Sequence, residues 1–264
     1  MRLQERLNVR PERHHGISTG TGSELRRQLL IPRPWLFTLA TASLVSLLCL
    51  PAGMAQAQTS GSVAIVSDYV YRGISLTNDK PALQFNLVYD APQGWYGGLF
   101  ATQMAASDNQ TRIRYIAYGG YSQTLPSGLN WELGANQFLM PQDSSTNYSE
   151  VYAGLGFERL SAKIHYSPNY LRANNKNIYL DLGATYPVTD MLDAFVHIGF
   201  SRLLPATIYD SRATRCDAML GLNLHQAEWT LRLGRTVQCG NQKTANPYAT
   251  AFQAATVLSI IRAF

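Results

Sequence analysis

From residue 63 to the C-terminus, apolar and polar residues alternate singly in runs of roughly ten residues. The run over residues 82–90 places four apolar side chains in one phase: Leu83, Phe85, Leu87 and Tyr89. Because successive side chains of a strand point to opposite faces, each run has one apolar and one polar face. A chain that repeats this pattern about a dozen times is typical of a barrel in a bacterial outer membrane.

The first 57 residues resemble a secretory leader. A basic flank ending at Arg33 precedes an apolar run over residues 35–50, and a small-x-small cleavage site ends at Ala57. We predict that residues 1–57 are a signal peptide with an over-long n-region, cleaved near Ala57. The alternative is a single membrane anchor, but the apolar run is shorter than the roughly 20 residues that a spanning helix needs.

Charge gives no reason to expect nucleic-acid binding. The full chain has a net charge of +5, whereas residues 58–264 carry 15 basic and 14 acidic side chains, a net charge of +1. The basic character therefore comes largely from the leader. No segment after it approaches the 18 or more consecutive apolar residues of a transmembrane helix. If these residues lie in a membrane, they do so as a closed barrel, because only helices and closed barrels satisfy their backbone hydrogen bonds in lipid.

The alternation predicts twelve strands in one domain, residues 58–264, separated by clusters of Gly, Pro, Asn, Asp and Ser. The predicted strands are 62–72, 82–90, 95–104, 112–122, 129–139, 148–158, 161–169, 177–186, 191–201, 213–224, 228–237 and 251–264. Connections after even-numbered strands are tight, and those after odd-numbered strands are mostly longer and polar, as in outer-membrane barrels. We therefore predict an all-β, antiparallel, up-and-down transmembrane β-barrel.

Aromatic residues gather at the tight-turn end of the predicted strands, in the apolar phase. They are Tyr89, Trp95, Tyr121, Trp131, Phe157, Tyr186, Trp229 and Phe264. Amphipathic rings favour the membrane–water boundary, and outer-membrane barrels carry girdles of them. The last strand ends on Phe264, as in the assembly signal of outer-membrane proteins, although Arg262 occupies an outward position that is usually apolar. We expect outer-membrane lipid and, through this strand, the barrel-assembly machinery as partners.

Two cysteines remain after the leader. Cys216 lies near the start of the tenth predicted strand, and Cys239 lies just past the end of the eleventh. These strands are antiparallel neighbours joined by a tight turn at the far end, so both cysteines fall at the same end of the barrel within bridging distance. In an oxidising compartment we expect a disulfide between them. The alternative is a pair of free thiols.

The polar phase of the strands would line the lumen of a closed barrel. Its candidate lumen-lining residues are Asp68, Arg72, Asp90, Arg112, Arg114, Glu132, Glu150, Lys163, His165, Asp181, Asp193, His197, Arg215, Asp217 and Arg232. The two signs are mixed, so the set does not predict cation or anion selectivity. For any one of these residues, an internal ion pair that stabilises the barrel is the stronger expectation.

Five segments resemble one known family. They are residues 67–75 (SDYVYRGIS), 80–84 (KPALQ), 94–99 (GWYGGL), 150–154 (EVYAG) and 166–170 (YSPNY). They are similar to segments of the TorF-type porins, the Gcw_chp family of bacterial outer-membrane proteins. The resemblance covers most of residues 58–264 and implies a signal peptide, an outer-membrane barrel and a channel role. It supplies no catalytic residues, and the Cys216/Cys239 pair is not part of the pattern.

Within the first of these segments, Asp68 and Arg72 share a phase. They would lie about 13 Å apart along a strand, too far to pair with each other, so each is expected to pair with a neighbouring strand. Arg72 and Gly73 would end the first strand at its loop, where Gly73 suits a turn with positive φ.

Three functions from different classes remain open. The first, which we expect, is a narrow porin for small solutes. A porin of this kind is not an enzyme. The second is an outer-membrane lipid-modifying enzyme that uses His165 and Ser167, two residues apart on one strand face, although Pro168 follows them directly. The third is a soluble periplasmic β-protein. No spacing of Cys, His and carboxylates predicts a metal site, and no loop predicts a phosphate or other cofactor site.

Overall fold

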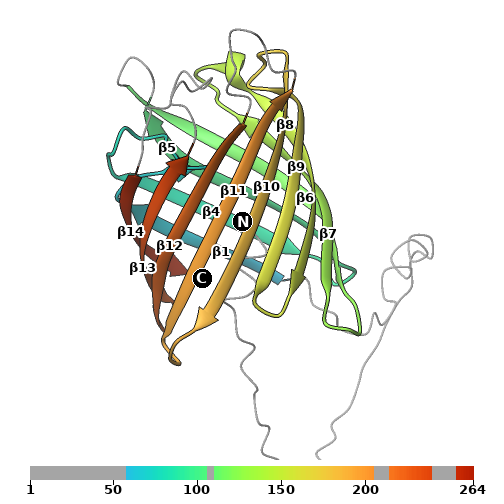
Figure 1. Ribbon diagram of the computed structural model, residues 1–264, viewed down its shortest axis with the longest axis vertical. Coiled ribbons are helices and arrows are strands. Elements are labelled where there is room, and N and C mark those ends of the chain that lie inside the picture. The colour runs from blue at the N-terminus through green and yellow to red at the C-terminus, as the bar shows by residue number, and fades with distance from the viewer. Residues whose placement is uncertain (1–57, 106–109, 205–213, 240–253) are drawn as a thin grey trace, which may run out of the picture. The chain divides into compact units, whose positions relative to one another are not determined.

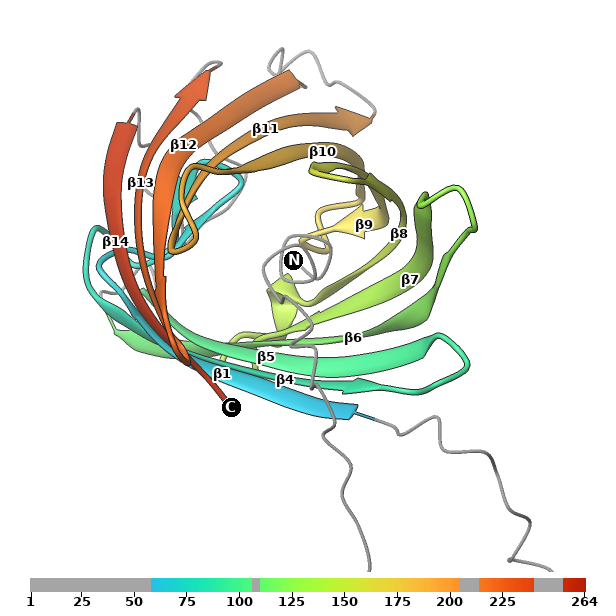
Figure 2. The ribbon, with the colours of Figure 1, turned by 90° about the horizontal axis from the view of Figure 1, so that it is seen from below.

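The computed structural model describes residues 58–105, 110–204, 214–239 and 254–264; the predicted signal peptide, residues 1–57, lies outside the described residues. Twelve antiparallel strands form one closed barrel (Figures 1 and 2). They are β1 (Gln58–Val66), β4 (Ala82–Asp90), β5 (Trp95–Ala105), β6 (Thr111–Thr124), β7 (Asn130–Leu139), β8 (Tyr148–Phe157), β9 (Leu160–Tyr170), β10 (Asn175–Pro187), β11 (Leu192–Leu204), β12 (Thr214–Gln226), β13 (Trp229–Cys239) and β14 (Ala254–Ala263). The predicted fold class is confirmed.

The barrel closes where the last strand meets the first. Strand β1 pairs with β4 on one side and with β14 on the other. The backbone N–H of Gly61 donates to the carbonyl of Phe264 at 2.9 Å, and the N–H of Phe264 donates back at 3.0 Å. The Phe264 ring lies over Gly61, because a Cβ built on Gly61 would meet that ring at 2.6 Å. The closed ring of strands leaves no unpaired edge in the wall.

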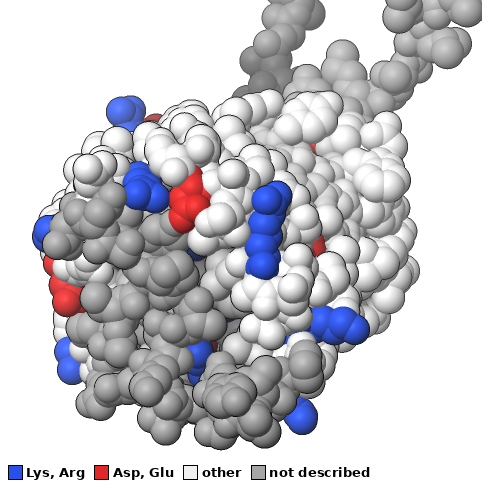
Figure 3. Space-filling view, turned by 90° about the horizontal axis from the view of Figure 1, so that it is seen from above, with Lys and Arg blue, Asp and Glu red and all other residues white. Residues whose placement is uncertain are grey.

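Outward and inward side chains differ in chemistry along each strand. In β4, Leu83, Phe85, Leu87 and Tyr89 are exposed on the outer face, whereas the alternate Asn86 is buried. Seen from above, charged side chains lie around this end of the barrel, and the part of the outer wall in view is largely uncharged (Figure 3). A closed wall with an apolar outer face is the arrangement that lipid requires. No helix in the described part of the chain has the length and apolarity to cross a membrane.

The first predicted strand is wrong in its second half. The chain leaves the barrel wall after Val66 and returns at Ala82. Between them, residues 67–81 turn into the barrel, and we call them the inward segment (Figure 2). It contains a hairpin of two short strands, β2 (Val70–Tyr71) and β3 (Ile74–Ser75), which pair with each other and not with the wall.

Two local features explain why the chain turns inward. The carboxylate of Asp68 accepts hydrogen bonds from the hydroxyls of Ser75 and Thr77, each at 2.7 Å, and so holds the hairpin closed. At the tip, Arg72 and Gly73 have φ values of 52° and 75°. Positive φ at both central residues is the geometry of a two-residue type I′ turn. Asp68 therefore pairs within its own segment, not with a neighbouring strand as predicted.

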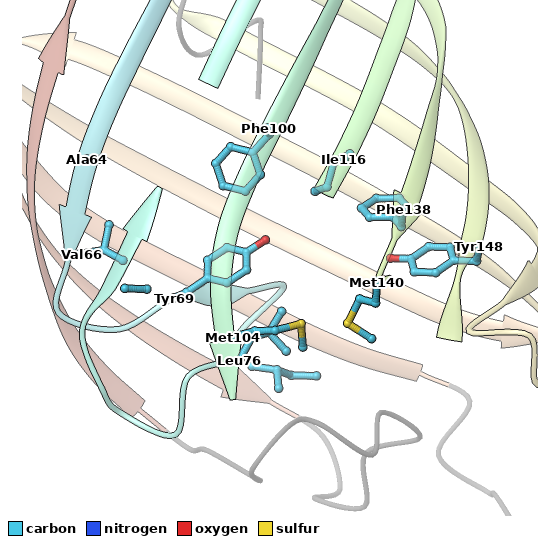
Figure 4. Close-up of a cluster of buried hydrophobic side chains, with 12 residues drawn as sticks. Ala64, Val66, Tyr69, Leu76, Phe100, Met104, Ile116, Phe138, Met140 and Tyr148 are labelled. Atoms are coloured by element: carbon cyan, nitrogen blue, oxygen red, sulfur yellow. The ribbon is translucent and has the colours of Figure 1, made fainter. Parts of the chain in front are cut away.

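The inward segment packs on an apolar cluster inside the barrel. The cluster joins Tyr69, Ile74 and Leu76 of the segment to wall residues near the long-loop end, and Figure 4 shows most of its members. Those wall residues are Ala64, Val66, Ala82, Phe100, Met104, Ile116, Phe138, Met140 and Tyr148. A soluble protein keeps such a cluster between layers, whereas here it fastens a segment of chain to one side of the lumen.

The connections at one end of the barrel are tight, and most at the other end are longer. Residues 140–147, which include the short helix η1 (Ser144–Thr146), join β7 to β8 at the long-loop end. The prediction of a longer connection between β9 and β10 is wrong. It has only four residues, 171–174, of which Leu171, Arg172 and Asn174 adopt positive φ. Left-handed backbone shortens the turn and lets both strands extend.

Candidate functional site

The lumen of the barrel contains the predicted polar residues. Thirteen of the fifteen lie on wall strands, and Asp68 and Arg72 lie on the inward segment. Several are deeply buried inside the barrel: Asp68, Arg114, Glu132, Glu150, Lys163 and Asp217. Since a buried charge is costly unless it is paired, the partners of these residues decide what the lumen can do.

Arg72 reaches across the lumen from the tip of the inward segment. Its two terminal nitrogens donate to the two carboxylate oxygens of Glu150 on β8, each at 2.9 Å. Its guanidinium also lies 4.1 Å from the ring centroid of Tyr179 on β10. Both side chains of the ion pair are buried. A bidentate pair of this kind fixes the orientation of both partners, so it ties the inward segment to the far wall.

Gly73 brings the tip of the inward segment against a second part of the wall. A Cβ built on Gly73 would meet the Cβ of Asp217 on β12 at 2.6 Å and the side chain of Gln238 on β13 at 3.4 Å. The tip therefore touches β8, β10, β12 and β13, whereas the base of the segment joins β1 and β4. The inward segment spans the lumen and narrows it.

A second polar group lies on β10, β11 and β12. The Nδ1 atom of His197 lies 2.9 Å from Asp181, and its Nε2 atom lies 2.8 Å from Asp217. The hydroxyl of Tyr179 donates to Asp217 at 3.2 Å. His197 thus bridges two carboxylates, and Tyr179 links this group to Arg72.

A third polar group lies nearer the tight-turn end. Lys163 forms a 2.7 Å ion pair with Glu132, and the hydroxyl of Tyr96 donates to the other oxygen of Glu132 at 2.7 Å. The hydroxyls of Tyr96 and Tyr152 lie 2.6 Å apart. Further towards the turns, His225 lies 3.0 Å from Asp193, and Arg232 donates to Asn223 at 2.8 Å.

Several large rings inside the barrel lie over glycines of neighbouring strands. The Tyr152 ring occupies the space above Gly134, where a Cβ would meet it at 2.5 Å. Tyr179 and Phe195 also project inward and are buried. The sequence pattern did not single out Tyr96, Phe100, Phe138 or Tyr148 as lumen residues. Their signal was present, because large rings recur in the inward phase of β5, β7 and β8.

His165 and Ser167, the residues of the enzyme hypothesis, both face the inside of the barrel. Ser167 is fully buried, and its hydroxyl donates to the carbonyl of Ser149 at 2.8 Å. The His165 ring lies against Glu150, with Nδ1 3.5 Å from the carboxylate. Neither side chain is presented to lipid. Among the described residues, no group of three or more His, Cys, Asp or Glu side chains forms a metal site.

The predicted girdle residues lie at the tight-turn end of the outer face. Trp95, Tyr186 and Phe264 are each more than 60% exposed. Trp95 packs edge-on against Tyr121 with ring centroids 5.2 Å apart, and Tyr121 lies 5.6 Å from Trp131. The guanidinium of Arg262 lies 5.6 Å from the Trp229 ring, so this outward charge rests on an aromatic face.

Cys216 lies near the start of β12 and is disulfide-bonded. In the ladder between β12 and β13, its register partner is Cys239. Directly opposite positions of an antiparallel pair bring two cysteines close enough to bridge.

Comparison with known proteins places the chain in a family. Residues 52–257 match the model of a family described as "Bacterial protein of unknown function (Gcw_chp)". A search of curated proteins finds no match.

Solved structures share the fold. The NanC porin has 9% identity and a TM-score of 0.52, and the KdgM porin in complex with disordered oligogalacturonate has 10% identity and a TM-score of 0.51. Each match covers 78% of this chain and 99% of the other. LpxR from Salmonella typhimurium, at 7% identity and with the same coverage of both chains, has a TM-score of 0.39. At these identities the likeness to the two porins concerns the fold alone. The match over residues 52–257 shows that the chain belongs to the Gcw_chp family of bacterial proteins.

Proposed function

We propose that this protein is a narrow channel of the bacterial outer membrane that admits small hydrophilic solutes, as a TorF-type porin. The observation that carries the proposal is a closed wall with an apolar outer face, whose polar lumen is crossed by the inward segment. A polar lumen with fixed charges suits water and small solutes. The porin fold of NanC and KdgM supports the proposal.

The proposal includes the route to the membrane. The chain would be exported with residues 1–57 as a cleaved signal peptide, and the assembly machinery would recognise its last strand. Cell fractionation tests this part. We expect the protein in the outer-membrane fraction, with an N-terminus near Gln58. Recovery in the soluble periplasmic fraction would favour the third hypothesis, a soluble β-protein.

Planar-bilayer recording tests the channel itself. Purified, folded barrel should give small discrete current steps in potassium chloride, and the same sample unfolded by heat should give none. A folded barrel that inserts into the bilayer but passes no current at any voltage would contradict the channel proposal and favour a structural role.

We propose no catalytic role for His165 and Ser167. The Ser167 hydroxyl is buried and donates to a backbone carbonyl, so it is not available as a nucleophile at a lipid surface. Assays of phospholipid and lipid A hydrolysis test this. We expect no activity in the wild-type protein; activity that Ser167→Ala abolishes would restore the enzyme hypothesis.

A further inference from the structure

The inside of the barrel has a cavity at its long-loop end, between the inward segment and strands β5 to β8. It is small, with a volume of about 20 Å³, and it is partly open to solvent. Its walls are mainly aromatic and thioether side chains, among them Tyr71, Phe138, Met140 and Tyr148, and Arg114 projects into it. Figure 4 shows Phe138, Met140 and Tyr148 side by side on this part of the wall.

Arg114 differs from the other deeply buried charges of the lumen. The residue is 6% exposed, yet no carboxylate among the described residues pairs with it. Within the described part of the chain, its hydrogen bond goes from Nη2 to the Tyr148 hydroxyl at 3.2 Å. Its guanidinium otherwise lies between two rings, 4.6 Å from the centroid of Tyr71 and 4.7 Å from that of Phe138.

A guanidinium in this position lacks an anion. It has five N–H donors, and a neutral hydroxyl and two ring faces do not balance its charge. Arg72 provides a direct contrast. Its guanidinium also lies over the Tyr71 ring, but it is paired with the Glu150 carboxylate. Burial of a cation without a counter-charge is costly, and an anion from solution that entered the cavity would remove this cost.

The chemistry of the walls limits which anion fits. Arg114 supplies one positive charge, so a dianion such as phosphate would leave its second charge facing Met140 and Phe138. A carboxylate matches the fork of the guanidinium with two parallel hydrogen bonds, which a halide cannot form. The apolar walls favour an organic group over a fully hydrated ion. At about 20 Å³ the cavity has room for little more than a carboxylate group, so any short chain behind it would lie at the open side.

We propose that this cavity is a binding subsite for small monocarboxylates at the outer mouth of the lumen, with Arg114 as the anion-binding residue. The proposal names a solute class for the channel and to that extent rests on the proposed function. The binding step itself needs only the folded barrel, so it can be measured without any current.

Fluorine NMR of difluoroacetate with the folded barrel in detergent micelles measures binding directly. We expect line broadening that acetate reverses and that acetamide, its neutral analogue, does not. Arg114→Gln should weaken binding at least about tenfold, because it removes a charged hydrogen-bond donor. Arg114→Lys keeps the charge and should restore part of the affinity. The matched control is Arg112→Gln, two residues earlier on the same inner face, where Arg112 already lies 3.9 Å from Asp143.

The outcomes separate the two proposals. Broadening that Arg114→Gln leaves unchanged, or that chloride reverses as well as acetate does, would overturn the carboxylate subsite. If Arg114→Gln does not fold, Arg114→Lys takes its place: wild-type affinity in Arg114→Lys, or a loss in Arg112→Gln as large as that in Arg114→Lys, would also overturn it. Current steps without carboxylate binding would leave the channel standing and refute the subsite. Carboxylate binding without current would support the subsite and refute the channel.

Discussion

The guanidinium of Arg72 and the carboxylate of Glu150, 78 residues apart in the chain, meet inside the barrel through two hydrogen bonds of 2.9 Å. One partner lies on the tip of the inward segment, and the other lies on the wall strand β8. This bidentate ion pair joins the segment to the far side of the lumen. The shape of the lumen therefore depends on it.

Glu150→Gln should loosen the inward segment. The substitution keeps the size of the side chain but leaves the buried Arg72 without a counter-charge, at a cost of about 3–5 kcal/mol. We expect a lower free energy of unfolding in urea and a larger, noisier single-channel conductance. Glu158→Gln, at an exposed tight turn, is the control and should change neither. Wild-type conductance in Glu150→Gln would show that the ion pair does not hold the segment.

Gly73→Ala should displace the tip of the inward segment. Gly73 has φ of 75°, and an added Cβ would also meet Asp217 at 2.6 Å. Gly128→Ala is matched in backbone strain, since Gly128 has φ of 85°, but its Cβ would meet nothing closer than 3.7 Å. In both variants the free energy of unfolding should fall by roughly 1–2 kcal/mol, because alanine is strained in the left-handed backbone conformation. Only Gly73→Ala should alter conductance; an equal change in both would locate the effect outside the lumen.

Deletion of Phe264 should impair closure of the barrel. Its backbone makes two hydrogen bonds with Gly61, and its ring lies over that glycine and beside Phe85. We expect less folded barrel in the outer membrane, measured by the mobility shift between heated and unheated samples on a gel. Phe157→Ala removes another exposed ring at the same end and should reduce the folded fraction less. Equal losses would assign the effect to the girdle in general.

Cys216 and Cys239 should resist alkylation in the exported protein. Their positions are directly opposite in the ladder of β12 and β13, and Cys216 is disulfide-bonded. Mass spectrometry after treatment with iodoacetamide should find both residues unmodified without reductant and modified with it. In Cys216→Ser, Cys239 should label in either condition. Labelling of both residues in the folded, unreduced protein would contradict the bond.

The sequence predicts the wall well because the alternation has a physical cause at every position. The strand predicted at 82–90 is β4 to the residue, and, apart from β1, the other wall strands lie within three residues of their predicted bounds. Lipid outside and water inside impose the same two-residue period on every strand. The period therefore recurs in the sequence wherever the chain lies in the wall.

The inward segment shows where this argument fails. The alternation continues through residues 67–72, so a hairpin inside the barrel has the same pattern as a strand of the wall. What separates them is the Asp68 contact with Ser75 and Thr77, and the contact of Arg72 with Glu150 across the lumen. The alternation of apolar and polar residues carries no information about these two sets of contacts. The positive φ expected at Gly73 was the one local sign of the turn.

The lumen residues divide in the same way. The alternation predicts that these side chains point inward, but it does not predict their partners. The order of strands in the wall does not determine which side chains meet across the lumen. Arg114 and Glu150 are alike in the sequence as charged residues of the polar phase. Only the structure shows that Glu150 is paired with Arg72, whereas Arg114 faces a cavity.

The central claim is that the inward segment narrows the lumen of a channel. Single-channel conductance of a variant with a shortened inward segment tests this claim most directly. Residues 69–79 would be replaced by a short Gly-Ser turn, which leaves β1 and β4 paired in the wall. The claim predicts small steps for the wild-type barrel and clearly larger steps for the variant, with both equally folded by gel mobility. Equal conductance of the two barrels, or no current from either, would contradict it.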